Sequence, residues 1–161
     1  MAGRRPPSSS SQFTTRPRPK VLIVDGHSMI FQWPELRALH AKNGATAREQ
    51  LVRGLLRHQD NTGTHVIVVF DGKGARASED EASIGIQVFY SKSGQTADAV
   101  IERIVATYAE RYEITVATDD HMERTTVESF GAKWISSELL AREVAESDRD
   151  LAARIEQLRR R

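Results

Sequence analysis

The chain has 161 residues, enough for one domain with a substantial core, and its hydrophobic share of 39% and charged share of 28% fit a folded protein. It contains no cysteine, which excludes disulfides, thiolate metal sites and cysteine nucleophiles. Its apolar runs are far shorter than a membrane span, so we expect a soluble, cytoplasmic protein with no membrane partner.

A basic segment precedes the expected domain. Residues 1–20 carry a charge of +5 and no acid, whereas the other 18 lysines and arginines face all 22 acids, giving −4. Residues 1–19 are rich in Pro, Ser and Arg, so burial cannot offset the entropy of ordering them. We predict a disordered basic tail; weak contact with nucleic-acid phosphates and a targeting role are the alternatives.

Over residues 20–161, short apolar runs alternate with longer segments of helical period. The runs have the Val, Ile and aromatic content of strands, at 21–24, 66–70, 86–90, 114–117 and 133–135. Helices are predicted at 34–40, 45–58, 98–112, 122–130 and 137–160, and a mobile loop at 73–85. This alternation predicts an α/β fold, a three-layer sandwich around a central, mainly parallel sheet of about five strands.

Acidic residues follow the predicted strands. Asp25 ends the first strand, Asp71 the second, and Asp119 and Asp120 the fourth. Asp98 lies in the first turn of the helix after the third strand. Because the carboxyl ends of parallel strands meet at one edge of the sheet, we expect these carboxylates to converge. Each acid also has a local alternative, as a turn residue or a helix cap.

Converging carboxylates require a positive partner, and no lysine or arginine recurs at matching strand ends. A divalent cation meets this need, and an oxygen-only ligand set suits Mg²⁺ or Mn²⁺ rather than zinc. Carboxylate-bound metals of this kind activate water and neutralise charge in phosphodiester cleavage. The pattern therefore points to a metal-dependent nuclease.

The chain contains, in order, VLIVDGHSMI, WPEL, VIVVFDG, YSKSGQTADAVIERIV, VATDDHMERTTVESFGA and ISSELLAREV. This order and spacing resemble the YacP-like NYN domain proteins, a bacterial branch of the PIN-like nuclease superfamily. The resemblance spans residues 20–145. It implies a PIN-like sandwich, a divalent-metal acidic site and endoribonuclease activity on RNA that leaves a 5′-phosphate, and, in a characterised branch, cleavage of messenger RNA on the ribosome.

The resemblance also implies roles for single residues. Asp25, Asp71, Asp98 and Asp120 match the family's catalytic acids. The metal ligands would be Asp25, Asp98 and Asp120, while Asp71 orients a water or completes the shell. The family's Asp-Gly-Tyr-Asn motif reads Asp-Gly-His-Ser here. Ser28 is shorter than Asn and lacks its amide, so the contact made at that position differs.

Five residues are candidates for substrate binding: His27, Ser28, Lys73, Arg76 and Arg124. For the three cations among them the alternative is a solvated surface charge. A noncatalytic RNA- or ribosome-binding module of the same fold is the alternative function. A phosphate-handling doubly wound domain is a third class, disfavoured because the chain has no glycine-rich phosphate loop.

Overall fold

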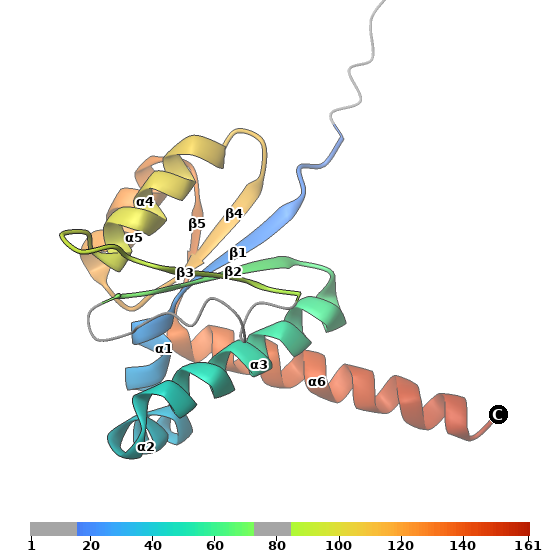
Figure 1. The fold of residues 1–161 in the computed structure, drawn as a ribbon. Helices are drawn as coiled ribbons and strands as arrows, with labels where there is room; N and C mark the ends of the chain where they lie inside the picture. The colour runs from blue at the N-terminus through green and yellow to red at the C-terminus, as the bar shows by residue number, and fades with distance from the viewer. Residues whose placement is uncertain (1–15, 73–84) are drawn as a thin grey trace, which may run out of the picture.

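The structure is a computed structural model that describes residues 16–72 and 85–161 (Figure 1). The predicted tail lies almost wholly outside the described residues, and so does the predicted loop at 73–85 apart from Gly85. Residues 16–19 are described and exposed, and the carbonyl of Pro19 accepts a hydrogen bond from the Glu113 backbone N–H at 2.9 Å.

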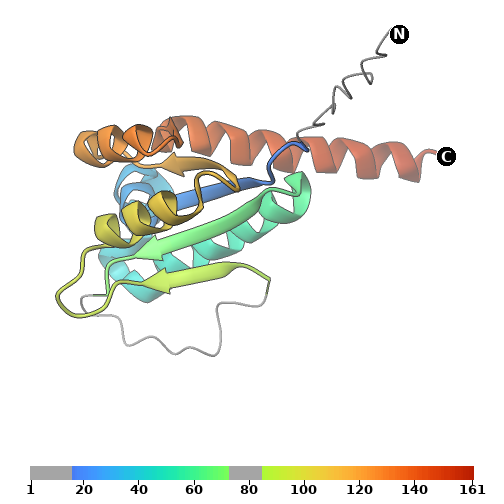
Figure 2. The ribbon, with the colours of Figure 1, turned by 90° about the horizontal axis from the view of Figure 1, so that it is seen from above.

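Five parallel strands form one sheet, which confirms the predicted fold class. The strands are β1 (Lys20–Asp25), β2 (His65–Phe70), β3 (Gln87–Tyr90), β4 (Glu113–Ala117) and β5 (Lys133–Ile135). Their order is β3-β2-β1-β4-β5, with all neighbours parallel. All five arrows therefore point to the same edge of the sheet (Figure 2).

Helices cover both faces of the sheet and complete the three layers (Figure 1). They are α1 (Gly26–Gln32), α2 (Pro34–Lys42), α3 (Gly44–Thr62), α4 (Ala97–Tyr108), α5 (His121–Ser129) and α6 (Ser137–Arg159). The helices α4 and α5 lie on one face, and the other four lie on the opposite face. The sequence did not predict α1, and α4 ends four residues earlier than expected.

Alternation along the strands gives each face of the sheet its own core. On one face Val24 and Val68 pack with Leu51 and Leu55 of α3. On the other face, the residues that alternate with these along β1 and β2 pack with α4. Each such side chain contributes about 1.5–3 kcal/mol when fully buried. The strands β1 and β2 are thus apolar on both sides, and their polar residues are confined to their ends.

The strand order places a topological switch point beside β1. From β1 the chain moves outward to β2 and β3, then crosses back to β4 on the other side of β1 and continues to β5. The segments after β1 and β4 therefore diverge, which opens the carboxyl edge of the sheet between them. Any group at the end of β1 or β4 lies at this opening.

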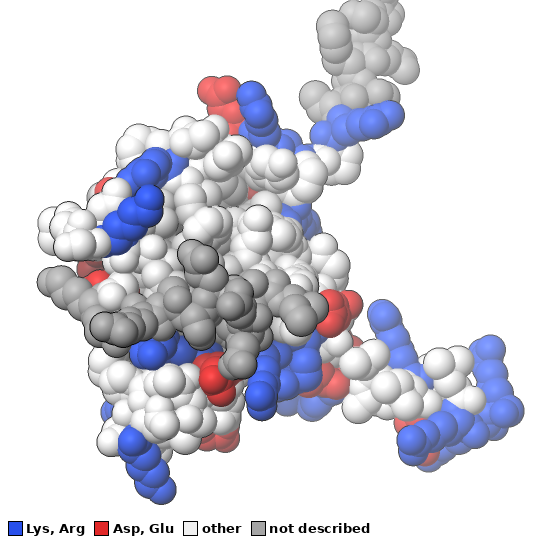
Figure 3. All heavy atoms as spheres, viewed as in Figure 1, with Lys and Arg blue, Asp and Glu red and all other residues white. Residues whose placement is uncertain are grey.

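The helix α6 extends beyond the body of the domain. Its first half packs on α3, where the Ser147 hydroxyl meets His58 Nδ1 at 2.9 Å and Asp148 accepts a hydrogen bond from Asn61 at 3.0 Å. Its last turns project past the end of α3 (Figure 1), and arginines gather along them (Figure 3). Within the described part of the chain, no helix has the length and apolar character that crossing a membrane requires.

Gly26, the first residue of α1, lets the turn after β1 pack on Phe70. A Cβ at Gly26 would lie 2.3 Å from Cε1 of Phe70, a ring that is fully buried and stacks on Tyr90 at 5.5 Å between centroids. The aromatic ring at the end of β2 therefore lies directly against the backbone that follows Asp25.

Replacing Gly26 by alanine should lower the free energy of unfolding by about 1–3 kcal/mol, because the added methyl overpacks a core with no spare volume. Gly54→Ala is the matched control. Gly54 lies in the middle of α3, and the atom nearest to a Cβ added there would be 3.8 Å away. The free energy of unfolding should therefore rise by about 0.5–1 kcal/mol. Urea denaturation of both variants measures the difference, and equal effects would contradict this account.

Candidate metal centre

Asp25 ends β1 and caps α1, and hydrogen bonds fix its carboxylate. Oδ1 accepts the backbone N–H of His27 at 3.2 Å, as an N-cap does. Oδ2 accepts the hydroxyls of Ser28 at 3.0 Å and of Thr118 at 3.1 Å. Asp25 is only 6% exposed. The sequence therefore holds this carboxylate in a buried place between the ends of β1 and β4.

Ser28 joins the turn after β1 to the segment after β4. Its hydroxyl donates to Asp25 and accepts the backbone N–H of Asp119 at 3.2 Å. Asp119 in turn accepts the backbone N–H of Ser137 at 2.9 Å and also the Ser137 hydroxyl. Ser28 thus links β1, β4 and the start of α6, and its predicted contact with substrate stays a prediction.

Three carboxylates from separate elements meet at the carboxyl edge. Asp25, Asp98 and Glu123 each offer one oxygen, and these three oxygens lie within 4.8 Å of one another. Asp98 lies in the first turn of α4, whose N-cap Thr96 accepts the Ala99 N–H at 3.1 Å. We call Asp25, Asp98 and Glu123 the acidic trio.

Burial, the charge of Asp25, and the hydrogen bond and charge of Asp98 together raise the pKa of Glu123 to about 9, against the opposite effect of the Thr118 hydroxyl. Glu123 is 1% exposed. Its Oε2 lies 2.9 Å from the Thr118 hydroxyl, which also contacts Asp25. Since a hydroxyl has one proton to donate, a protonated Glu123 relieves this competition. Without a cation, the trio therefore holds a proton at neutral pH.

The pKa of Asp98 is also raised, by burial first and then by the charges of Asp25, Asp120 and Asp71. A hydrogen bond with the Glu123 side chain acts in the opposite direction and lowers it. Asp71 and Asp120 therefore lie close enough to act on the trio, although they are outside it. Five carboxylates thus contribute to one negative region. Four of them are the acids whose convergence the sequence predicted.

The trio fits a hard divalent cation. Mg²⁺ binds oxygens at about 2.0–2.1 Å in an octahedron, which places neighbouring and opposite ligands about 3–4.2 Å apart. Among the described residues, no N–H or hydroxyl group donates a hydrogen bond to the buried Glu123 Oε1; the carboxyl of Glu123 instead shares a hydrogen bond with that of Asp98. Across residues 16–72 and 85–161, no lysine or arginine forms an ion pair with a member of the trio. A cation would satisfy both the charge and the buried oxygen.

Asp120 has a different position from the one that the sequence suggested. Its Oδ1 accepts the backbone N–H groups of Met122 at 2.9 Å and Glu123 at 3.2 Å, so it is the N-cap of α5. The structure brings Glu123, one helical turn later, into the trio instead. Asp120 as a metal ligand stays a prediction, since its charge still acts on Asp98.

Asp71 follows β2 and is positioned by Ser91, which follows β3. The buried Ser91 hydroxyl lies 3.2 Å from Asp71 Oδ1 and accepts the backbone N–H of Gly72 at 2.9 Å. A Cβ at Gly72 would lie 1.9 Å from the Ser91 carbonyl oxygen, so only glycine allows this approach. Asp71 is thereby held at the rim of the negative region, beside the trio.

The remaining predicted substrate contacts are distributed as follows. The His27 ring stacks on Phe31 at 5.9 Å between centroids, and its buried Nε2 has no hydrogen-bond partner. The Arg124 guanidinium lies 3.8 Å from the centre of the Trp134 ring and bonds to Glu128 at 2.7 Å. Lys73 and Arg76 lie outside the described residues. Contact of these residues with RNA stays a prediction.

Sequence reasoning did not assign Glu123 or Thr118 to the site. The spacing of Asp120 and Glu123 is that of a capping box, in which the glutamate bonds back to the N-cap backbone. That pattern has a local explanation, so it gave no signal for a buried carboxylate. Thr118 follows an apolar strand directly and has the same position relative to β4 that Asp25 has in β1. A polar residue at a second strand end beside the switch point was the available signal.

The raised pKa of Glu123 predicts a pH-dependent stability in metal-free solution. The folded chain binds more protons than the unfolded chain between pH 4.5 and about 9, so the free energy of unfolding falls as pH rises through that range. Glu123→Gln should remove this fall, which is at most about 1.4 kcal/mol per pH unit. Urea denaturation in EDTA from about pH 5 to pH 9 measures it. Parallel curves for both proteins would contradict the prediction.

The affinity for a cation should show which of Glu123 and Asp120 is the ligand. Glu123→Gln should weaken Mn²⁺ binding at least about tenfold, because a ligand is lost. Asp120→Asn should weaken it less, because asparagine also caps helices and keeps α5 in place. Isothermal titration of both variants makes the comparison. A larger loss for Asp120→Asn would make Asp120 the ligand.

Comparisons with known proteins agree with this architecture. Residues 22–161 match the family described as the YacP-like NYN domain. The chain is 33% identical over 140 residues to the uncharacterized protein YacP of Bacillus subtilis (strain 168), covering 86% of this chain and 82% of that protein. The crystal structure of Rae1 (YacP) from Bacillus subtilis superposes with a TM-score of 0.77 at 33% identity, over 86% of this chain and 81% of that one. Its W164L mutant gives a TM-score of 0.75 over 86% and 82%. The chain belongs to the YacP-like NYN domain family.

Proposed function

We propose that this protein is a divalent-metal-dependent endoribonuclease that uses Mg²⁺ or Mn²⁺. The observation that carries the proposal is the acidic trio, whose oxygens from three elements lie within 4.8 Å of one another with the buried Glu123 among them. Membership in the YacP-like NYN domain family, whose fold is of the nuclease type, supports it.

Asp25, Asp98 and Glu123 would hold the cation, which supplies Lewis acidity that lowers the pKa of a water and neutralises charge on the phosphodiester. Glu123 gives up its proton when the cation binds, because a ligating carboxylate must be ionised. The Thr118 hydroxyl then donates to Asp25 or Glu123 and keeps both carboxylates in place.

Asp71 lies at the rim and orients the attacking water, and Ser91 fixes its direction. Water attacks the phosphorus, the bond to the 3′ oxygen breaks, and a proton passes to that oxygen. The products are a 5′-phosphate and a 3′-hydroxyl. The ribosome as the place of cleavage stays a prediction drawn from the family.

Cleavage of a single-stranded RNA by the purified chain tests this function. We expect internal cleavage with Mg²⁺ or Mn²⁺ and none in EDTA. Asp25→Asn and Glu123→Gln should each reduce the rate at least about 100-fold, because each removes a charged ligand. Glu102→Gln is the matched control, since Glu102 lies one turn after Asp98 on α4 and outside the trio. RNA binding without cleavage, unchanged by metal, would favour the noncatalytic module instead.

A further inference from the structure

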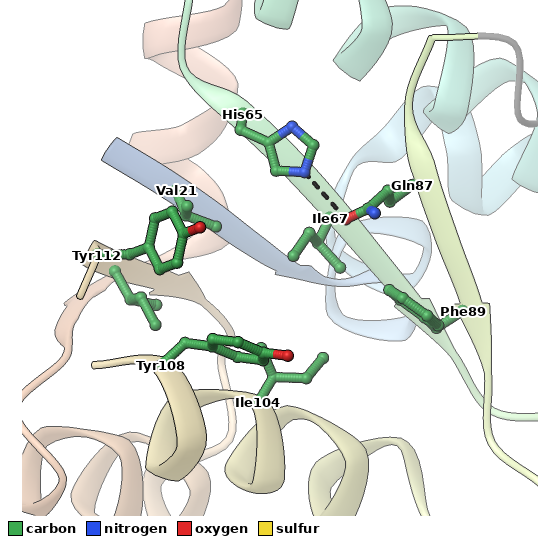
Figure 4. Close-up of a pocket in the computed structure, with 9 residues that line it drawn as sticks. Val21, His65, Ile67, Gln87, Phe89, Ile104, Tyr108 and Tyr112 are labelled. Atoms are coloured by element: carbon green, nitrogen blue, oxygen red, sulfur yellow. Dashed lines mark hydrogen bonds between the residues drawn. The ribbon is translucent and has the colours of Figure 1, made fainter. Parts of the chain in front are cut away.

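A hollow of about 330 Å³ lies between the start of the sheet and the end of α4 (Figure 4). Val21 and Ile67 are part of its lining, and three aromatic rings surround it. In the close-up, Tyr108 and Tyr112 lie on one side and Phe89 on the other. None of these residues belongs to the acidic trio or its hydrogen-bond network.

The three rings are partly exposed to solvent. Phe89 is 42% exposed, Tyr108 43% and Tyr112 37%. The two tyrosines meet edge to face at 6.1 Å, which supports their rings without covering them. A monomeric domain gains by burying such rings, so a group of them around one hollow indicates a ligand.

The hollow and the acids lie on the same face of the sheet. Because strand side chains alternate, Val21 and Asp25 point to the same side, as do Ile67 and Asp71. Phe89 is paired in register with Val69 and comes two residues before Ser91, the partner of Asp71. Two strand residues span about 7 Å, and the whole of β2 about 20 Å. The hollow therefore lies on the same face as the acids, about 20 Å along the sheet from them, and the partly exposed Phe89 lies on the edge strand β3.

The rim of the hollow is basic at Arg18, which donates to the carbonyl of Ala109, next to Tyr108, at 2.6 Å. Lys20 is paired in register with Glu113, and both alternate with residues that line the hollow, so they point to the other face of the sheet. Glu113 does not neutralise Arg18, because Lys133 binds it at 2.6 Å. The hydrogen bond and charge of Lys133, and then the charges of Lys20 and Arg18, lower the pKa of Glu113, which shows that all three cations are near.

Polar groups at the other wall offer recognition. His65 Nε2 lies 2.9 Å from Gln87 Oε1 (Figure 4), which leaves the Gln87 amide nitrogen as a donor. Aromatic faces, a basic rim and a few amide or imidazole groups are the combination that binds single-stranded nucleic acid.

We propose that this hollow binds a single-stranded stretch of the RNA substrate on one side of the cleaved phosphodiester. Bases stack on Phe89, Tyr108 and Tyr112, and Arg18 contacts the phosphates. The assignment rests on the proposed function for the identity of the ligand. A double helix does not fit, because its bases are already stacked on each other, and the basic rim disfavours a second copy of the chain.

RNA binding by ring-deletion variants tests the proposal. Phe89→Leu and Tyr108→Leu keep apolar volume but remove the ring face, and are made in an Asp25→Asn background so that RNA stays intact. Fluorescence anisotropy with a short labelled single-stranded RNA should show Kd raised about 5- to 100-fold. Tyr108→Phe should bind like the parent. Phe130→Leu, an exposed aromatic away from the hollow, should also leave Kd unchanged.

The basic rim has its own measurement. Arg18→Ala should lower the slope of log Kd against log salt by about 0.7, the value for one phosphate contact to a single strand. Arg154→Ala, on the projecting end of α6, is the control and should leave this slope unchanged. An unchanged slope for Arg18→Ala would overturn the contact.

The outcomes distinguish this proposal from the one on which it rests. If the unmodified chain cleaves RNA with metal but the leucine variants bind RNA as tightly as the Asp25→Asn chain does, the hollow is not an RNA site. If the leucine variants lose RNA binding while no metal supports cleavage, the hollow stands and the nuclease proposal falls. Equal competition by duplex RNA would overturn the single-strand assignment. A change in sedimentation of the leucine variants, with RNA binding intact, would assign the hollow to a second copy.

Discussion

Repulsion between carboxylates dominates the physics of this protein. Two carboxylates about 4 Å apart repel each other by roughly 4 kcal/mol at an effective dielectric constant of 20, and burial adds to that cost. One oxygen each of Asp25, Asp98 and Glu123 lies within 4.8 Å of the other two at the open edge of the sheet. A proton on Glu123 offsets part of the repulsion, and a divalent cation would offset more. The hydrogen bonds around the acidic trio would hold its carboxylates in place with either partner, the proton or the cation.

The rigid frame of the sheet is what keeps the acids together despite the repulsion. Asp25 is fixed because β1 lies in the centre of the sheet and because hydroxyls from two segments bind its carboxylate. Ser28 shows how a departure from the family motif is accommodated. Its short side chain bonds to Asp25 and to the backbone after β4, so serine is long enough to connect the two strand ends.

Much of the architecture could be predicted from the sequence because its signals are local. Apolar runs that end in polar residues defined the five strands, and the parallel order followed from their alternation with helices. The helix α1 was missed because it follows β1 with no intervening loop and Asp25 looks like a strand end rather than a cap. The convergence of Asp25, Asp71, Asp98 and Asp120 followed from topology alone.

The details of the site depend on side-chain direction, which sequence spacing does not fix. Asp120 and Glu123 both lie at the start of α5, and only packing decides that Asp120 turns to the helix backbone while Glu123 turns to the sheet. The exposed rings beside α4 were equally hidden. Tyr108 and Tyr112 fell within a predicted helix, but α4 ends at Tyr108 and leaves both rings beside the sheet.

The direction of α6 has a practical consequence. The helix starts beside the acids, where Ser137 bonds to Asp119, and its 23 residues run about 35 Å toward the opposite edge of the domain. Its final turn is therefore a suitable anchor point for a bead, a dye or a sensor chip. Coupling there leaves the carboxyl edge facing open solution, so single molecules can be watched without blocking the acidic trio.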